Sequence, residues 1–191
     1  MGKIYYVMGK SCSGKDTIYR RLTERHPELR VVVPYTTRPI REGEQDGVEY
    51  FFVDREKMEE MQAAGRIIEL RSYNTLLGVW NYFTADDGQI DLASHSYLII
   101  GTLVSYEAMR DYYGAEALVP IYVEVEDGTR LERAIGRERK QAKPQYEEMC
   151  RRFLADAEDF SEEKLRRAGI TKRFVNTDLE QCLEEIDTYI R

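Results

Sequence analysis

Short, continuous apolar runs recur in both end regions of the chain and alternate with amphipathic or charged segments. Runs of this length are typical of buried strands in a parallel sheet. They lie at Ile4–Met8, Leu29–Val33, Tyr97–Ile100, Ile121–Val125 and Phe174–Asn176. The segments between and after them predict helices at Thr17–Arg25, Val104–Tyr113, Thr129–Lys140, Gln145–Asp159 and Leu179–Ile190. This alternation favours an α/β fold built on a parallel sheet.

The pattern changes between residues 34 and 92. Shorter strand-like pieces occur here, and one helix is expected from Arg55 to Ala64, with Asp54 as its N-cap and Gly65 as its stop. The strand-like pieces are Tyr50–Val53, Ile67–Tyr73 and Val79–Thr84. We therefore expect a core formed by residues 1–33 and 93–191, with a small mixed α/β lobe inserted at 34–92.

Composition narrows the possible partners. The chain has 191 residues, 42% of them hydrophobic and 33% charged, which suits one globular domain or a core with an inserted lobe. The net charge of −7 disfavours binding to duplex nucleic acid, which usually requires a basic face. Small polyanions remain possible where arginine and lysine cluster. We expect small-molecule substrates and neither a nucleic-acid nor a membrane partner.

Cysteine usage and the first residues suggest a location. The three cysteines Cys12, Cys150 and Cys182 are far apart, and their odd number disfavours a disulfide framework. The first apolar run is too short for a signal peptide or a membrane span. A reduced, cytoplasmic location is expected, whereas the sequence leaves open whether the protein is a monomer or a homodimer.

A glycine-rich loop follows the first predicted strand. Residues 9–17 read Gly-Lys-Ser-Cys-Ser-Gly-Lys-Asp-Thr, which fits Gly-x-x-x-x-Gly-Lys between a strand and a helix. In such a loop backbone N–H groups and the helix N-terminus converge on phosphate, the glycines permit the required backbone angles, and the lysine reaches the β- and γ-phosphates. The predicted ATP-binding residues here are Gly9, Ser11, Ser13, Gly14, Lys15, Asp16 and Thr17. The alternative is a glycine-rich turn that binds nothing.

Asp16 departs from the usual pattern, in which a serine or threonine follows the lysine. Carboxylate oxygens suit Mg²⁺, so Asp16 is a candidate metal ligand, directly or through water. The alternative is that its charge repels phosphate. Thr17 supplies a hydroxyl one position later.

A second cluster of candidate residues begins at Thr36-Thr37-Arg38. Two arginines three residues apart, Arg38 and Arg41, precede Tyr50, and this set can converge on one phosphate because arginine offers a planar donor fork and tyrosine a hydroxyl. The alternative is a surface ion-pair network of the arginines with Glu42, Glu44 and Asp46.

Together these motifs resemble the guanylate kinase family. The family signature is Thr-Thr-Arg, two residues, Arg, two residues, an acidic residue, two residues, Gly, two residues, Tyr, one residue, an aromatic and an aliphatic residue. Every position is met between Thr36 and Val53. The resemblance implies a three-layer P-loop kinase core, an inserted lobe that binds the nucleoside monophosphate and a short helical lid at about 128–150. It also implies transfer of the γ-phosphoryl group of ATP to GMP or dGMP with Mg²⁺.

The resemblance further assigns roles to individual residues. Arg38, Arg41, Tyr50 and Tyr82 would bind the GMP phosphate, and Glu69 would accept the N1–H and N2–H₂ donors of guanine. Lys15 and the lid arginines Arg137, Arg151 and Arg152 would act on the transferring phosphoryl group, and Asn176 would contact adenine. The alternatives are a solvated strand residue for Glu69, solvated charged helices for the lid arginines and a turn-forming residue for Asn176.

Three departures from the family bear on the acceptor. Pro34-Tyr35 stand where a serine usually precedes Thr-Thr-Arg. The family's Asn-Tyr-Tyr-Gly segment has two possible counterparts, at 77–79 and at 81–84. Leu98–Thr102 lacks the paired aspartates of the family's core strand, for which Asp86, Asp87 and Asp91 are possible substitutes. Two alternatives therefore remain: a kinase of the same fold for another nucleotide or a sugar phosphate, and a non-catalytic peptide-binding module.

Overall fold

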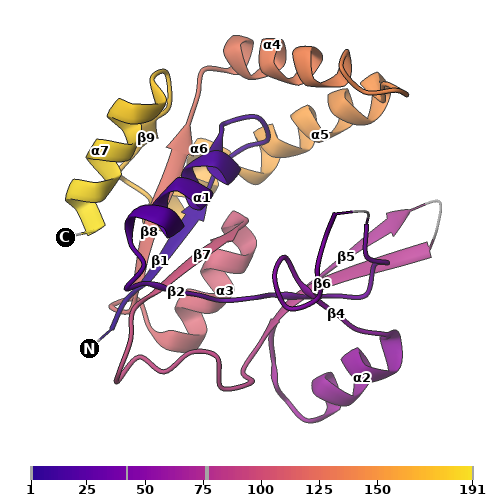
Figure 1. Ribbon diagram of the computed structural model, residues 1–191, viewed down its shortest axis with the longest axis vertical. Helices are drawn as coiled ribbons and strands as arrows, with labels where there is room; N and C mark the ends of the chain where they lie inside the picture. Colours follow the sequence, from indigo (N-terminus) through magenta and orange to yellow (C-terminus); the bar gives the residue numbers. More distant parts are fainter. Residues whose placement is uncertain (1, 42, 76–77, 191) are drawn as a thin grey trace.

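A computed structural model describes residues 2–41, 43–75 and 78–190. Its larger sheet has the strand order β2-β7-β1-β8-β9, and all of its neighbouring strands are parallel (Figure 1). These strands are β1 Ile4–Met8, β2 Arg30–Val31, β7 Tyr97–Gly101, β8 Leu118–Glu124 and β9 Phe174–Val175. The predicted parallel α/β core is confirmed, although β2 and β9 are shorter than the apolar runs suggested.

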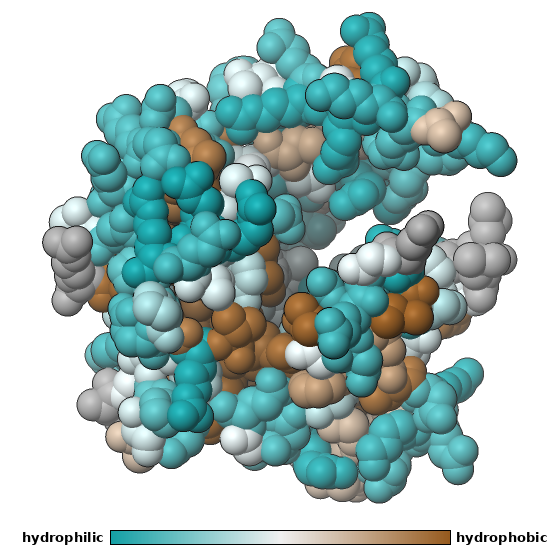
Figure 2. All heavy atoms as spheres, viewed as in Figure 1, coloured by the Kyte–Doolittle hydropathy of each residue, from teal (hydrophilic) through white to brown (hydrophobic). Residues whose placement is uncertain are grey.

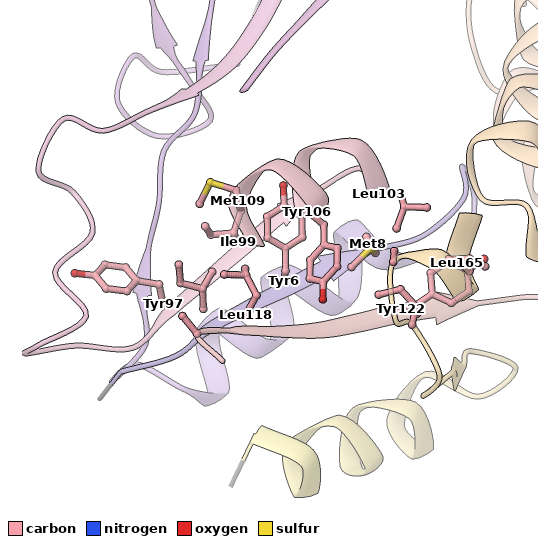
Figure 3. Packing of buried hydrophobic residues seen from close by; sticks show 14 of the residues in the cluster. Tyr6, Met8, Tyr97, Ile99, Leu103, Tyr106, Met109, Leu118, Tyr122 and Leu165 are labelled. Carbon is pink, nitrogen blue, oxygen red and sulfur yellow. The ribbon is translucent and has the colours of Figure 1, made fainter. Parts of the chain in front are cut away.

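Helices cover both faces of this sheet because the side chains of its strands alternate between them. Tyr6 and Met8 pack with α3 (Leu103–Tyr113), in the cluster that Figure 3 shows. Val7 faces the opposite layer, which contains α1 (Lys15–Arg25) and α7 (Leu179–Ile190). The result is the three-layer arrangement expected from the sequence.

The second sheet lies within residues 35–85 and has the order β4-β3-β6-β5. Its strands are β3 Tyr35–Thr36, β4 Phe51–Phe52, β5 Ile67–Thr75 and β6 Gly78–Ala85. Helix α2 (Arg55–Ala63) covers one face, and the Asp54 carboxylate caps it by accepting the Lys57 N–H at 2.7 Å. Gly65 then ends this segment in the left-handed region, at φ 68°. The mixed lobe thus has its own sheet and core, whereas the domain limits at 34 and 92 stay a prediction.

Two long helices form an arm beyond the larger sheet (Figure 1). They are α4 (Asp127–Glu138) and α5 (Tyr146–Asp159), and the short α6 (Glu162–Arg167) follows. The first two agree with the charged helices predicted for the lid, while α6 was missed. Among the described residues, no helix is long and apolar enough to cross a membrane.

Candidate active site

The loop between β1 and α1 has the backbone form of an anion-binding nest. Cys12 and Gly14 both lie in the left-handed region, at φ 63° and 87°, and Gly14 directly precedes the first residue of α1. Such reversals turn successive N–H groups toward one side, where the helix N-terminus adds positive potential. Gly14 is required for a second reason: a Cβ there would lie 2.4 Å from Nδ2 of Asn176.

The predicted reason for a glycine at position 9, its freedom of backbone angles, is wrong. The backbone of Gly9 is not in the left-handed region, so conformational freedom is not the reason for a glycine here. A Cβ at this position would instead lie 2.5 Å from the carbonyl oxygen of Val123 and 2.9 Å from Oγ of Ser13. Gly9 therefore lets the loop pass close to β8.

Lys15 and Asp16 lie next to each other at the start of α1. Nζ of Lys15 is 3.2 Å from a carboxylate oxygen of Asp16, whose side chain is 81% exposed. Thr17 is exposed as well. Within the described residues no group of three or more His, Cys, Asp or Glu side chains forms a metal site. Mg²⁺ usually needs only one or two carboxylates plus substrate phosphates, so this donor set fits it.

Asn176 holds the phosphate loop from the far end of the chain. The side chain is buried, and its Nδ2 donates to the carbonyl oxygen of Ser13 at 2.8 Å. The Asn176 carbonyl oxygen accepts from Nη2 of Arg133 at 3.1 Å. This loop-holding role was not predicted, and the adenine contact proposed for Asn176 remains a prediction.

A pocket of about 200 Å³ lies between α4, α5 and the phosphate loop. Arg137 and Arg152 line it beside Ser11 and Cys12 of the loop. Arg151 does not line it: the guanidinium forms two 2.7 Å hydrogen bonds with Glu148 along α5, and the side chain is 64% exposed. The structure thus brings two of the three predicted lid arginines to the loop.

A larger pocket, of about 340 Å³, lies beside the ends of β8 and β9. Glu124, Glu126 and Asp127 line it, with Lys10 and Arg130 as the basic residues. Lys10 is 3.5 Å from Asp127, and Arg130 also pairs with that carboxylate. The smaller pocket has three arginines against Glu138 and Glu148, whereas the larger one has three carboxylates against two basic side chains. The smaller pocket is therefore the better candidate for phosphate.

The lobe brings Arg38, Tyr50 and Tyr82 together. The Arg38 guanidinium lies over the Tyr50 ring, 5.2 Å from its centroid, and the rings of Tyr50 and Tyr82 are 5.6 Å apart. Arg38 is buried and forms two hydrogen bonds with Glu44, at 2.7 and 2.5 Å. Glu44 also accepts the backbone N–H of Arg41 at 2.8 Å. The Arg38 guanidinium lowers the pKa of Glu44 to about 2, because its donors favour the ionised carboxylate.

The alternative of an ion-pair network is seen in part. Among the described residues, Arg38 pairs with Glu44, but inside the lobe rather than at its surface. Phosphate binding by this segment stays a prediction. Arg41 is exposed, and its guanidinium lies 6.0 Å from the Trp80 ring centroid. Glu42 is outside the described residues.

Thr36 and Thr37 hold two strands of the lobe together, a structural role that the motif did not predict. The Thr36 hydroxyl donates to the Asn81 carbonyl oxygen at 2.9 Å, and the Thr37 hydroxyl accepts from Asn81 N at 3.0 Å and Nδ2 at 3.2 Å. These bonds fix β6 against β3 one residue before Tyr82. Of the two possible counterparts of the family segment, residues 81–84 therefore lie beside Arg38 and Tyr50. Leu77 of the other counterpart is outside the described residues.

Glu69 lies on β5 and is buried, so it is not a solvated strand residue. Its carboxylate accepts from Nε and Nη2 of Arg71, at 2.9 and 3.1 Å, and from the Thr84 hydroxyl at 2.9 Å. Neither partner was among the predicted site residues. Only the register of the hairpin indicates these two partners, because it pairs Glu69 with Thr84 and Arg71 with Tyr82.

The end of β7 leaves no room for a side chain at Gly101, within the segment where the family has paired aspartates. A Cβ at Gly101 would lie 2.2 Å from the Tyr6 hydroxyl, which donates to Oγ of Ser105 at 2.7 Å. Burial raises the pKa of Tyr6. The proposed substitutes have other partners: Asp86 accepts from Tyr112, Asp87 from Tyr35 and Gln89, and Asp91 from the backbone N–H of Ala93. Tyr35 itself packs against Phe51 and Phe83.

The lid arm and the lobe lie on either side of an open cleft. Figure 2 shows this recess between the arm of α4 and α5 and the β5–β6 hairpin. The phosphate loop lies at the base of the arm, and the arginine–tyrosine cluster belongs to the lobe. Two sets of cationic and hydroxyl side chains beside one cleft could position two phosphorylated substrates for a transfer between them.

Comparison with known proteins supports this arrangement. The family model of guanylate kinase matches residues 1–90. A guanylate kinase of Frankia casuarinae is 54% identical over 63 residues, and one of Neisseria gonorrhoeae 40% identical over 100, covering 34% and 46% of those relatives. The crystal structure of guanylate kinase from Anaplasma phagocytophilum has a TM-score of 0.66 at 20% identity, covers 100% of this chain and 85% of that one, and supports the fold.

One relative aligns along its whole length. A guanylate kinase of Synechococcus sp. is 30% identical over 204 aligned residues, which cover 100% of this chain and 96% of the relative. The aligned region therefore includes the loop after β1, the inserted lobe and the arm of α4 and α5. The chain belongs to the guanylate kinase family.

Proposed function

We propose that this protein transfers the γ-phosphoryl group of ATP to GMP or dGMP, giving ADP and the corresponding diphosphate. The observation that supports this most directly is the cluster of Arg38, Tyr50 and Tyr82 across the cleft from the phosphate loop. A non-catalytic module would need neither an ATP-phosphate nest with its lysine nor arginines aimed at the loop.

On the ATP side, the loop N–H groups and Lys15 hold the β- and γ-phosphates. The Ser13 hydroxyl is buried without a hydrogen-bond partner among the described residues, so it is a donor that a phosphate oxygen could accept. From the lid, Arg137 and Arg152 stabilise charge on the transferring group. Such preorganised charge supplies most of the catalysis in phosphoryl transfer.

Asp16 is the residue that we propose for Mg²⁺, directly or through water. At Asp16 the metal would supply positive charge that neutralises the ATP phosphates. In the structure Asp16 pairs with Lys15, so the carboxylate and the ammonium group already lie on the same side of the loop. The exposed carboxylate can turn from the lysine to the metal without a change in the helix.

On the acceptor side, Arg38 and Arg41 hold the GMP phosphate with the hydroxyls of Tyr50 and Tyr82. Glu44 holds the Arg38 guanidinium and the Arg41 backbone in place before the substrate arrives. Glu69 lies further along the same hairpin, where it recognises the base. We also propose a cytoplasmic location, since Cys12, Cys150 and Cys182 are all unpaired thiols.

The test is an acceptor screen with ATP and Mg²⁺, measured as ADP release. The acceptors are GMP, dGMP, AMP, UMP, CMP and sugar phosphates, and the control is Lys15→Ala, which should lose phosphoryl transfer. Turnover with GMP and dGMP supports the proposal. Turnover with a sugar phosphate or CMP alone, or no turnover together with no ATP binding, contradicts it.

A further inference from the structure

Arg71 contacts Glu69, one of the proposed acceptor residues, and has no role in the function proposed above. It lies two residues after Glu69 on β5, and therefore on the same side of the strand, and it faces Tyr82 across the hairpin. Arg71 therefore contacts the proposed base-recognising carboxylate and pairs in the hairpin with Tyr82 of the proposed phosphate site.

Most acceptor positions of the Glu69 carboxylate are already occupied by hydrogen bonds within the protein. An ionised carboxylate has about four acceptor positions, two on each oxygen. Oε1 already accepts from Nη2 of Arg71 and from the Thr84 hydroxyl, and Oε2 accepts from Nε of Arg71. Among the described residues, one position on Oε2 is left. A guanine base that offered both N1–H and N2–H₂ would find one acceptor rather than two.

The exposed fractions of the two side chains also indicate that a bound base would meet Arg71 as well as Glu69. The Glu69 side chain is only 3% exposed, whereas that of Arg71 is 21% exposed. A base that reaches this pair therefore meets the edge of the guanidinium together with one carboxylate oxygen. Arginine has five N–H donors, of which Glu69 takes two, so donors remain for a carbonyl oxygen of the ligand.

We propose that Arg71 makes the base site specific for the N1–H and C6=O edge of a 6-oxopurine rather than for the 2-amino group of guanine. Glu69 accepts N1–H, and Arg71 donates to the C6 carbonyl oxygen. This inference rests on the proposed function and adds an acceptor to it. IMP has the same edge as GMP and lacks only the 2-amino group, so both are substrates with similar kcat/KM.

Adenine presents the opposite pattern on this edge. Its N1 is an acceptor facing the Glu69 carboxylate, and its 6-amino group is a donor facing Arg71. Both contacts are mismatched, and sites that leave buried polar groups unpaired reject such analogues by about 10⁴-fold or more. AMP is therefore excluded by the same pair that admits GMP and IMP.

The experiment measures kcat/KM and the equilibrium dissociation constant for GMP and IMP with the unaltered protein and with Arg71→Met. Methionine keeps an apolar stem in place of the arginine and removes its donors, which frees both oxygens of Glu69 for guanine. We expect the GMP-to-IMP ratio to rise by about fivefold or more in the variant, because the 2-amino group gains an acceptor. A smaller change, or a change in favour of IMP, overturns the inference.

Two further variants keep the test decisive. Arg55→Met on α2 is the matched control: that arginine belongs to the same lobe, its side chain is 81% exposed, and its ion pair is with Glu59. Its GMP-to-IMP ratio should stay that of the unaltered protein. If Arg71→Met does not fold, Arg71→Lys is measured instead, with the same expected change in the GMP-to-IMP ratio. The lysine ammonium group lacks the planar guanidinium that binds both carboxylate oxygens of Glu69.

The two binding constants separate this inference from the proposed function. If no nucleotide is turned over, the proposed function fails, while the GMP-to-IMP ratio of dissociation constants still tests Arg71. If both nucleotides are phosphorylated and the ratio does not change in the variant, the proposed function stands and the role of Arg71 is refuted.

Discussion

Asp156 of the lid helix α5 accepts a hydrogen bond from the backbone N–H of Ser11 in the phosphate loop, at 2.8 Å. The same carboxylate oxygen is 3.0 Å from Nη2 of Arg130, whose Nε donates to the Ser11 carbonyl oxygen at 2.9 Å. One loop residue is therefore held by both helices of the arm. Arg152 lies on the same helix as Asp156, so this contact fixes the helix that places Arg152 beside the loop.

Asp156→Ala should lower kcat by about 10- to 100-fold, because misplacement of a catalytic group by about 1 Å has effects of that size. Asp156→Asn keeps an oxygen acceptor for the Ser11 N–H and should recover part of the loss. Steady-state kinetics with ATP and GMP provide the measurement. A variant with a lower melting temperature and an unaltered kcat would show that Asp156 stabilises the fold without positioning the lid.

Removing Arg152 should lower kcat far more than removing its neighbour Arg151. Arg152 lines the pocket at the phosphate loop, and its loss should lower kcat by about 10²- to 10³-fold, as expected for one charge-stabilising donor. Arg151 does not line that pocket, is paired with Glu148 and is 64% exposed, so Arg151→Ala should change kcat by less than about fivefold. Equal losses in both variants would contradict the orientation of α5 described above.

Gly101→Ala should destabilise the protein by about 1–3 kcal/mol, the usual cost of forcing atoms into a packed core. Its Cβ would lie 2.2 Å from the Tyr6 hydroxyl and 2.8 Å from Oγ of Ser105. The matched control is Gly136→Ala in α4, where no described atom lies within 4 Å of the added Cβ. That change should stabilise the helix by about 0.5–1 kcal/mol. Urea unfolding of both variants provides the measurement, and a neutral Gly101→Ala would show that Tyr6 does not set the residue at this position.

The sequence was informative where a local pattern has one structural solution. The apolar run before Gly9 predicted β1, and the loop spacing predicted the nest, because strand, turn and helix follow one another in the chain. The spacing of Arg38 and Tyr50 agrees with their contact in the lobe, whereas Arg41 lies beside Trp80, and their role as an acceptor site stays a prediction. In each case, neighbours in sequence determine the geometry.

Contacts between distant segments could not be predicted in this way. Asn176 reaches Ser13, and Asp156 reaches Ser11, across more than 140 residues, and only the packed fold brings them together. Arg71 was missed for a different reason. A charged residue on a strand usually faces solvent, and only the hairpin register shows that this one turns toward Glu69. The short α6 lacked a strong periodic signal.

Glu44 should contribute stability that depends on pH. Its pKa is lowered from 4.5 to about 2 by the hydrogen bonds from Arg38, so the folded state binds its proton more weakly than the unfolded state does. The stabilisation is therefore complete above the unfolded pKa and is lost as the pH falls from about 4.5 to about 2. Comparing the free energy of unfolding of the unaltered protein with that of Glu44→Gln cancels the titration of the other carboxylates. We expect a constant difference between pH 5.5 and 7 and a smaller one at pH 4 and pH 3. A difference that stays constant down to pH 3 would mean that the Arg38–Glu44 pair is not formed in solution.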